Sequence, residues 1–158
     1  MAEAVLDNAK AAGLKTGKRF KAFLSHYKEE CGADARIVKQ MMPGSGQAFL
    51  DSDDLTDLRL LMEHVKQSEC LVLLQSKGVL TRPWVLLELY TAITNDVPVV
   101  ALNVARRGYN YGAAETLLRH IDSFDEGVSK LLTENGADPV DVAYRLSDTL
   151  PNLSLIHI

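Results

Sequence analysis

The sequence contains few of the residues that would place it in a specialised structural class. Only two cysteines, Cys31 and Cys70, occur among its 158 residues, and no Cys-x-x-Cys pair is present. This excludes a disulfide framework and a cysteine zinc site. Aromatic residues make up 6% of the chain, and 17 Lys and Arg against 21 Asp and Glu give a net charge of −4. That balance argues against a broad basic face for nucleic acid or anionic membranes.

Long apolar runs are absent as well. Apolar segments such as 71–74 are far too short to cross a bilayer, and the first residues contain no apolar core of a signal peptide. We therefore expect no membrane segment and, with so few cysteines, a reduced cytoplasmic location. The remaining composition, 47% hydrophobic and 24% charged, is ordinary for one globular domain.

What the chain does contain is an alternation of strand-like and helix-like segments. Short apolar runs predict strands at 20–25, 48–51, 70–75 and 98–104. Helical periodicity and capping signals predict helices at 29–42, 55–65, 82–95, 113–121, 124–134 and 139–150. Because parallel strands require right-handed crossovers, this alternation predicts an α/β three-layer sandwich of the flavodoxin-like kind. Its central parallel sheet has the order 2-1-3-4-5, with helices on both faces.

The two ends of the chain differ from this pattern. Residues 1–18 are rich in alanine and charge and are interrupted by glycine, which predicts a lead-in that is either a short helix or a linker. Residues 153–158, LSLIHI, resemble the translation of an adapter used in sequencing libraries. We therefore expect the domain to occupy 19–152 and to lack its native final strand and helix. A fifth strand at 153–158 is the alternative, and the two are compatible because such residues can still pair at a sheet edge.

The expected topology places a binding site at one edge of the sheet. In open α/β sheets, ligands bind beyond the carboxyl ends of the strands where the strand order reverses, here between the first and third strands. The loop after the first strand supplies polar side chains, namely Ser25, His26, Tyr27 and Lys28. Trp84 and Glu88 lie one turn apart on the helix after the third strand, so they meet on one surface, opposite the predicted buried arc of that helix.

Four segments together resemble the Toll/interleukin-receptor (TIR) domain family. FKAFLSHYKE resembles its first sequence box, AFLDSDDL its second strand and BB loop, SECLVLLQSKGVLTRPWVLLELYTAI its third strand and αC helix, and VPVVAL its fourth strand. The resemblance covers about residues 19–104 in the right order and spacing, which is more specific than a single motif. It implies the same flavodoxin-like fold.

The resemblance implies one of two functions. Some TIR domains cleave the nicotinamide–ribose bond of NAD⁺ with a catalytic Glu on αC, and the matching residue here is Glu88. NAD⁺ is then a substrate and no cofactor is needed. The product is ADP-ribose or a cyclic form of it. In that case we expect the site to be lined by Trp84 and by the loop residues Ser25, His26, Tyr27 and Lys28.

The alternative is a non-catalytic interaction module in signal transduction, of the kind that serves innate immunity. Both functions imply other TIR domains as partners, through self-association. The resemblance assigns this contact to the BB loop, with residues Ser52, Asp53, Asp54 and Leu55, and to the outer faces of the helices that match αB and αC.

The candidates also have ordinary structural interpretations. A lone Glu88 would be a solvated helix charge and Ser25 a strand end bonded to backbone, but the Trp-x-x-x-Glu pattern at the reversal point favours catalysis. The carboxylates at 51–54 suit helix capping better than metal binding, so no metal site is expected. Two other classes share the fold. A phosphoacceptor receiver would need acidic residues directly after the first strand, and a flavodoxin would need a glycine- and hydroxyl-rich phosphate loop there, which HYKEE is not.

Overall fold

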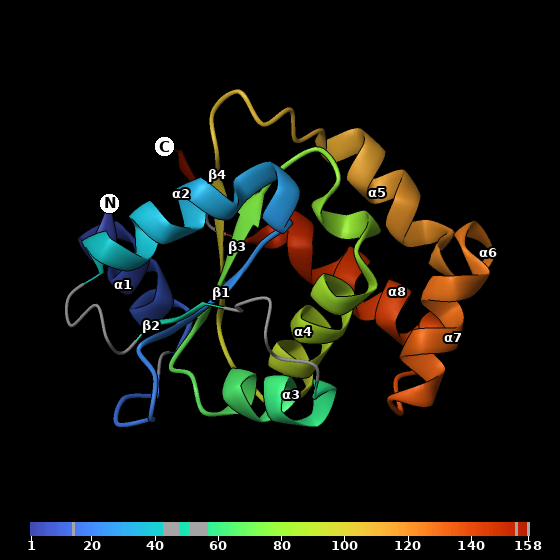
Figure 1. Ribbon diagram of the computed structural model, residues 1–158, viewed down its shortest axis with the longest axis horizontal. Coiled ribbons are helices and arrows are strands. Elements are labelled where there is room, and N and C mark those ends of the chain that lie inside the picture. The colour runs from blue at the N-terminus through green and yellow to red at the C-terminus, as the bar shows by residue number, and fades with distance from the viewer. Residues whose placement is uncertain (14, 43–47, 51–56, 154, 158) are drawn as a thin grey trace.

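A parallel sheet forms the centre of the protein. The structure is a computed structural model that describes residues 1–13, 15–42, 48–50, 57–153 and 155–157. The strands are β1 (Ala22–Ser25), β2 (Ala48–Leu50), β3 (Leu71–Gln75), β4 (Val99–Asn103) and β5 (Leu155–His157). They pair in parallel in the order β2-β1-β3-β4-β5, with the three-residue β5 along β4 (Figure 1). The predicted fold class and strand order are confirmed.

Helices cover both faces of this sheet (Figure 1). One face carries α1 (Ala2–Ala11) and α2 (Lys28–Met41). The other carries α3 (Leu58–Lys66), α4 (Pro83–Thr94), α5 (Tyr111–Arg119), α6 (Ile121–Phe124), α7 (Glu126–Glu134) and α8 (Pro139–Thr149). Two short turns, η2 (Val79–Thr81) and η3 (Leu150–Asn152), precede α4 and β5.

The two helical layers rest on two separate buried clusters, and strand geometry explains why. Successive side chains of a strand point to opposite faces of the sheet. On β3, Leu71 and Leu73 therefore join the cluster under α3 and α4, whereas Val72 and Leu74 join the cluster under α1 and α2. Because both faces are covered, the strand is an unbroken apolar run, as its sequence predicts.

The segment before β1 forms part of the domain. Its helix α1 buries Val5 and Ala9 completely in the cluster under α2. After the helix, the buried carboxylate of Glu69 accepts hydrogen bonds from the Gly17 backbone N–H at 2.7 Å and from Lys21 Nζ at 2.9 Å. Of the two interpretations for residues 1–18, the structure shows a helix over Ala2–Ala11, and Gly17 after it is held by Glu69 at the amino end of β3.

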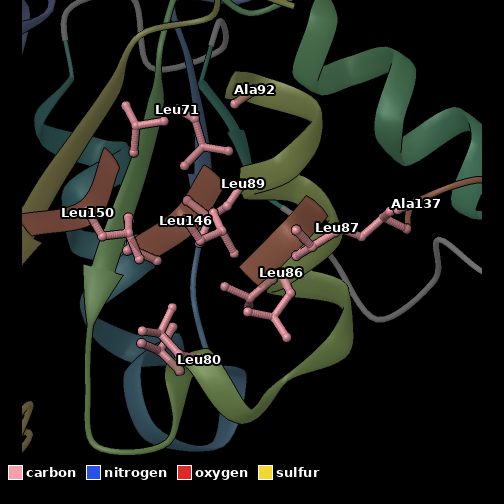
Figure 2. Close-up of a cluster of buried hydrophobic side chains, with 14 of the residues drawn as sticks. Leu71, Leu80, Leu86, Leu87, Leu89, Ala92, Ala137, Leu146 and Leu150 are labelled. Atoms are coloured by element: carbon pink, nitrogen blue, oxygen red, sulfur yellow. The ribbon is translucent and has the colours of Figure 1, made fainter. Parts of the chain in front are cut away.

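Helix α4 is buried around most of its circumference, because α7 and α8 cover the side that faces away from the sheet. Figure 2 shows Leu86 and Leu89 of α4 in one cluster with Leu146 of α8. The prediction that α4 has an outer polar face is wrong at two positions, because Glu88 faces Ser25 of β1 and Thr91 faces Met62 of α3. Glu88 is 3% exposed and Thr91 is 7% exposed. A helix that is apolar on nearly all sides is typical of a protein interior.

The burial of α4 predicts a large stability cost for truncating it. Leu89→Ala should lower the free energy of unfolding by about 2–5 kcal/mol, because Leu89 is fully buried and its cavity cannot refill easily. Leu60→Ala on α3 is the control: Leu60 is 46% exposed, and its loss should cost under about 1 kcal/mol. Urea unfolding measures both, and equal losses would contradict the buried position of α4.

Candidate functional site

A buried hydrogen bond between β1 and α4 forms the centre of the candidate site. Ser25 is the last residue of β1, and its side chain shares a face with Phe23, toward α4. The Ser25 hydroxyl donates to Glu88 Oε2 at 2.5 Å. The two residues are 1% and 3% exposed. The loop after the first strand and the helix after the third thus meet as the sequence predicts, but in a buried contact where a cleft is expected.

This pair lies where the strand order reverses. β1 has β2 on one side and β3 on the other, and Ser25 is in register with Leu73. The carboxylate of Glu88 therefore sits just inside the carboxyl edge of the sheet, where open α/β sheets bind their ligands. A carboxylate removed from water is costly unless hydrogen bonds compensate it, so its presence here requires a structural or chemical reason.

The remaining predicted residues of the β1–α2 loop differ in their burial and contacts. His26 is half-buried, with Nδ1 3.4 Å from the Leu24 carbonyl oxygen. Tyr27 precedes α2, and its hydroxyl donates to Glu29 Oε2 at 2.5 Å. Lys28 is exposed at the start of α2. Of the four predicted loop residues, Ser25 is joined to Glu88 by a hydrogen bond.

Trp84 occupies the first turn of α4, directly after Pro83 at the helix start. Its side chain is half-buried and packs against the cluster under α3 and α4. It lies one turn before Glu88, as predicted, but it is partly a core residue and not a freely exposed ring. Trp84 therefore covers part of the interior at the start of α4.

Sequence reasoning missed the residues that hold the β3–α4 loop against α2. The Gly78 backbone N–H donates to Glu30 Oε2 at 2.9 Å, and the Arg82 guanidinium lies 4.7 Å from the centre of the Tyr27 ring. A Cβ on Gly78 would lie 3.0 Å from Glu30 Oε1 and 3.3 Å from the Tyr27 ring, so only glycine fits without displacement. The glycine before the turn was a signal in the sequence. Its partner Glu30 lies 48 residues away and carries no such signal.

The predicted interaction residues Ser52, Asp53, Asp54 and Leu55 lie outside the residues that the structure describes. The described part of α3 begins with Asp57 as its cap, whose carboxylate accepts a hydrogen bond from the Arg59 N–H at 3.0 Å. Within the described ranges, no cluster of three or more His, Cys, Asp or Glu side chains could hold a metal ion.

The chain matches no protein-family model and, at a significant level, no curated protein. Across the part of the chain that the structure describes, every helix is too short or too polar to cross a membrane. The geometry around Glu88 and the resemblance of residues 19–104 therefore carry the functional argument.

The surroundings of His26 predict a dependence of stability on pH. Burial lowers the pKa of His26 below its usual 6.5, against the hydrogen bond to Leu24, and the charges of Arg36 and Lys28 act with burial. The unfolded state therefore takes up a proton at a higher pH than the folded state. The stability associated with neutral His26 is complete above about 6.5 and is lost as the pH falls through the lower folded pKa.

Urea unfolding at about pH 7.5 and about pH 5 tests this, with His26→Gln beside the unchanged protein. We expect the variant to lose less stability on acidification. Burial also lowers the pKa of His64, which is present in both proteins and so contributes equally to both. Identical losses in the two proteins would show that His26 is as readily protonated in the fold as outside it.

Proposed function

We propose that this chain is a TIR domain that hydrolyses NAD⁺ to nicotinamide and ADP-ribose, or to a cyclic form of it, with Glu88 as the single catalytic carboxylate. The observation that carries the proposal is the pairing of Ser25 with Glu88, 2.5 Å apart and buried where the strand order reverses. The parallel sheet and its strand order agree with the fold that the TIR resemblance implies.

The chemistry needs one fixed carboxylate. When the bond between ribose C1′ and nicotinamide N1 breaks, its electron pair leaves with nicotinamide, and the ribose becomes an oxocarbenium-like cation. Nicotinamide departs as a neutral molecule, so no general acid is required. Water then adds to C1′ and releases a proton. Glu88 stabilises the cation, and its field is strong because the surroundings of the carboxylate exclude water.

The neighbouring residues suit the rest of the substrate. Trp84, one turn before Glu88, stacks on the nicotinamide or the ribose. Lys28, exposed at the start of α2, interacts with a phosphate as a point charge, beside His26 and Tyr27 in the same loop. Because Glu88 is 3% exposed, the substrate must displace part of its cover, and the half-buried Trp84 is placed to move.

The interaction-module function has one observation in its favour. Of the two helices that the resemblance assigns to assembly, α4 has little outer face left, because α7 and α8 cover it. Helix α3 does present a large apolar side chain to solvent, since Leu60 is 46% exposed. This surface supports self-association through α3, which is compatible with catalysis and does not require it.

Glu88→Gln separates catalysis from packing. The amide has nearly the same shape, and its oxygen can still accept the Ser25 hydroxyl, so the fold should persist. Nicotinamide release from NAD⁺, followed at high protein concentration, should fall by about 10²–10³-fold, because the charge opposite the developing cation is lost. Glu134→Gln, an exposed carboxylate on α7, should release nicotinamide at the unchanged rate.

Circular dichroism and urea unfolding of the same samples complete the comparison. If the unchanged protein is folded and self-associated but releases no nicotinamide, the interaction-module function is the correct one. If Glu88→Gln and the unchanged protein release nicotinamide equally fast, Glu88 is a structural residue.

Ser25→Ala tests the positioning of Glu88. We expect kcat to fall about tenfold with little change in KM, because the carboxylate loses a donor that orients it. The free energy of unfolding should fall by about 1–3 kcal/mol, since a buried acceptor loses a partner. Ser25→Cys keeps a weak donor of similar size. Its kcat and free energy of unfolding should lie between those of the unchanged protein and of Ser25→Ala. A raised KM with unchanged kcat would instead place Ser25 in direct contact with the substrate.

A further inference from the structure

A groove separate from Glu88 opens at the same edge of the sheet. It lies between the turn η2 and helix α5, and the loop from β4 to α5 lines it as well. Its volume of about 690 Å³ falls within the roughly 300–1,000 Å³ of small-molecule sites. Neither Glu88 nor residues 25–28 belong to its lining.

The walls of the groove are largely apolar. Leu80, at one end of the buried cluster drawn in Figure 2, forms one wall, and Leu117 and Ala113 of α5 form the other. Tyr109 adds an aromatic ring, which is held edge-on against Tyr111 with the ring centres 4.9 Å apart. The lining combines this ring with small residues, which leaves room for a flat, apolar body.

The side chains that line the groove can carry positive charge only, apart from Tyr109. Lys77 and His120 are its ionisable side chains apart from Tyr109, and no carboxylate lines it. Within the described ranges, no acidic side chain pairs with the Lys77 ammonium. The backbone of Lys77 is fixed by its N–H, which donates to the Arg107 carbonyl at 2.8 Å. An unpaired cation at the edge of an apolar groove is complementary to a ligand that is apolar at one end and anionic at the other.

We infer that this groove binds a small aromatic anion, with its flat body between η2 and α5 and its anionic group at Lys77. The inference does not depend on the proposed reaction at Glu88. Such an anion is either a nucleoside monophosphate or an aromatic carboxylate, because both combine a flat ring system with a negative group.

The probe is 8-anilinonaphthalene-1-sulfonate, an aromatic anion whose fluorescence increases in an apolar site. We expect saturable binding at one site per chain. Lys77→Glu should weaken it about tenfold, the equivalent of one charge contact. Lys130→Glu on α7 makes the same change of charge at an exposed lysine outside the groove, and should change the affinity less than about twofold.

A second pair of variants tests the space itself. Thr116→Trp places a large ring in the groove from α5 and should abolish binding. Arg119→Trp makes a comparable change on the same helix outside the groove, and should bind the probe normally. Circular dichroism shows whether each variant is folded. Glu88→Gln should also bind normally, which separates this inference from the proposed function.

Competition identifies the ligand. Displacement of the probe by adenosine monophosphate assigns a nucleotide, and displacement by 1-naphthoate alone assigns an aromatic carboxylate. Three results would overturn the inference: fluorescence that does not saturate, equal weakening by Lys77→Glu and Lys130→Glu, or full binding by folded Thr116→Trp.

Discussion

The enclosure of α4 determines most of what the site can be. The helix packs on the sheet with one side and under α7 and α8 with the other, so few of its positions reach water. Each residue on it must therefore be apolar or have a polar partner. Glu88 satisfies this condition through the Ser25 hydroxyl, which the pleat of β1 directs toward α4. The position of the candidate catalytic group thus follows from the packing of a whole helix.

The carboxyl edge of the sheet is held together by contacts between its loops. The Gly78 N–H reaches Glu30 of α2, and Arg107 of the β4–α5 loop pairs with Asp34 of α2 at 2.7 Å. The Arg107 carbonyl in turn accepts the Lys77 N–H. Helix α2 and the loops after β3 and β4 therefore form one connected platform. Glu88 lies under one part of it, and the groove beside η2 opens at another.

The fold could be predicted from the sequence because its signals are local. Short apolar runs separated by helical periods determine a parallel sheet, and the crossover rule leaves few strand orders. The burial of Glu88 could not be predicted in this way. Periodicity within α4 places Glu88 opposite the apolar arc, but its carboxylate faces β1, where its partner Ser25 lies 63 residues away in the sequence. The contact between Arg82 and the Tyr27 ring was missed for the same reason, since neither residue carries a local signal for the other.

The burial of Glu88 also bears on whether this residue has a structural or a chemical role. On a solvated face, a glutamate would be interchangeable with many polar residues and would carry little information. Inside the protein, a polar pair that serves only to join β1 and α4 could be replaced by apolar side chains of similar volume, like Leu86 and Leu89 nearby, often with no loss of stability. A buried carboxylate with an orienting hydroxyl is a costly way to fill space. It is a suitable way to hold a negative charge in one place until a positive charge develops beside it.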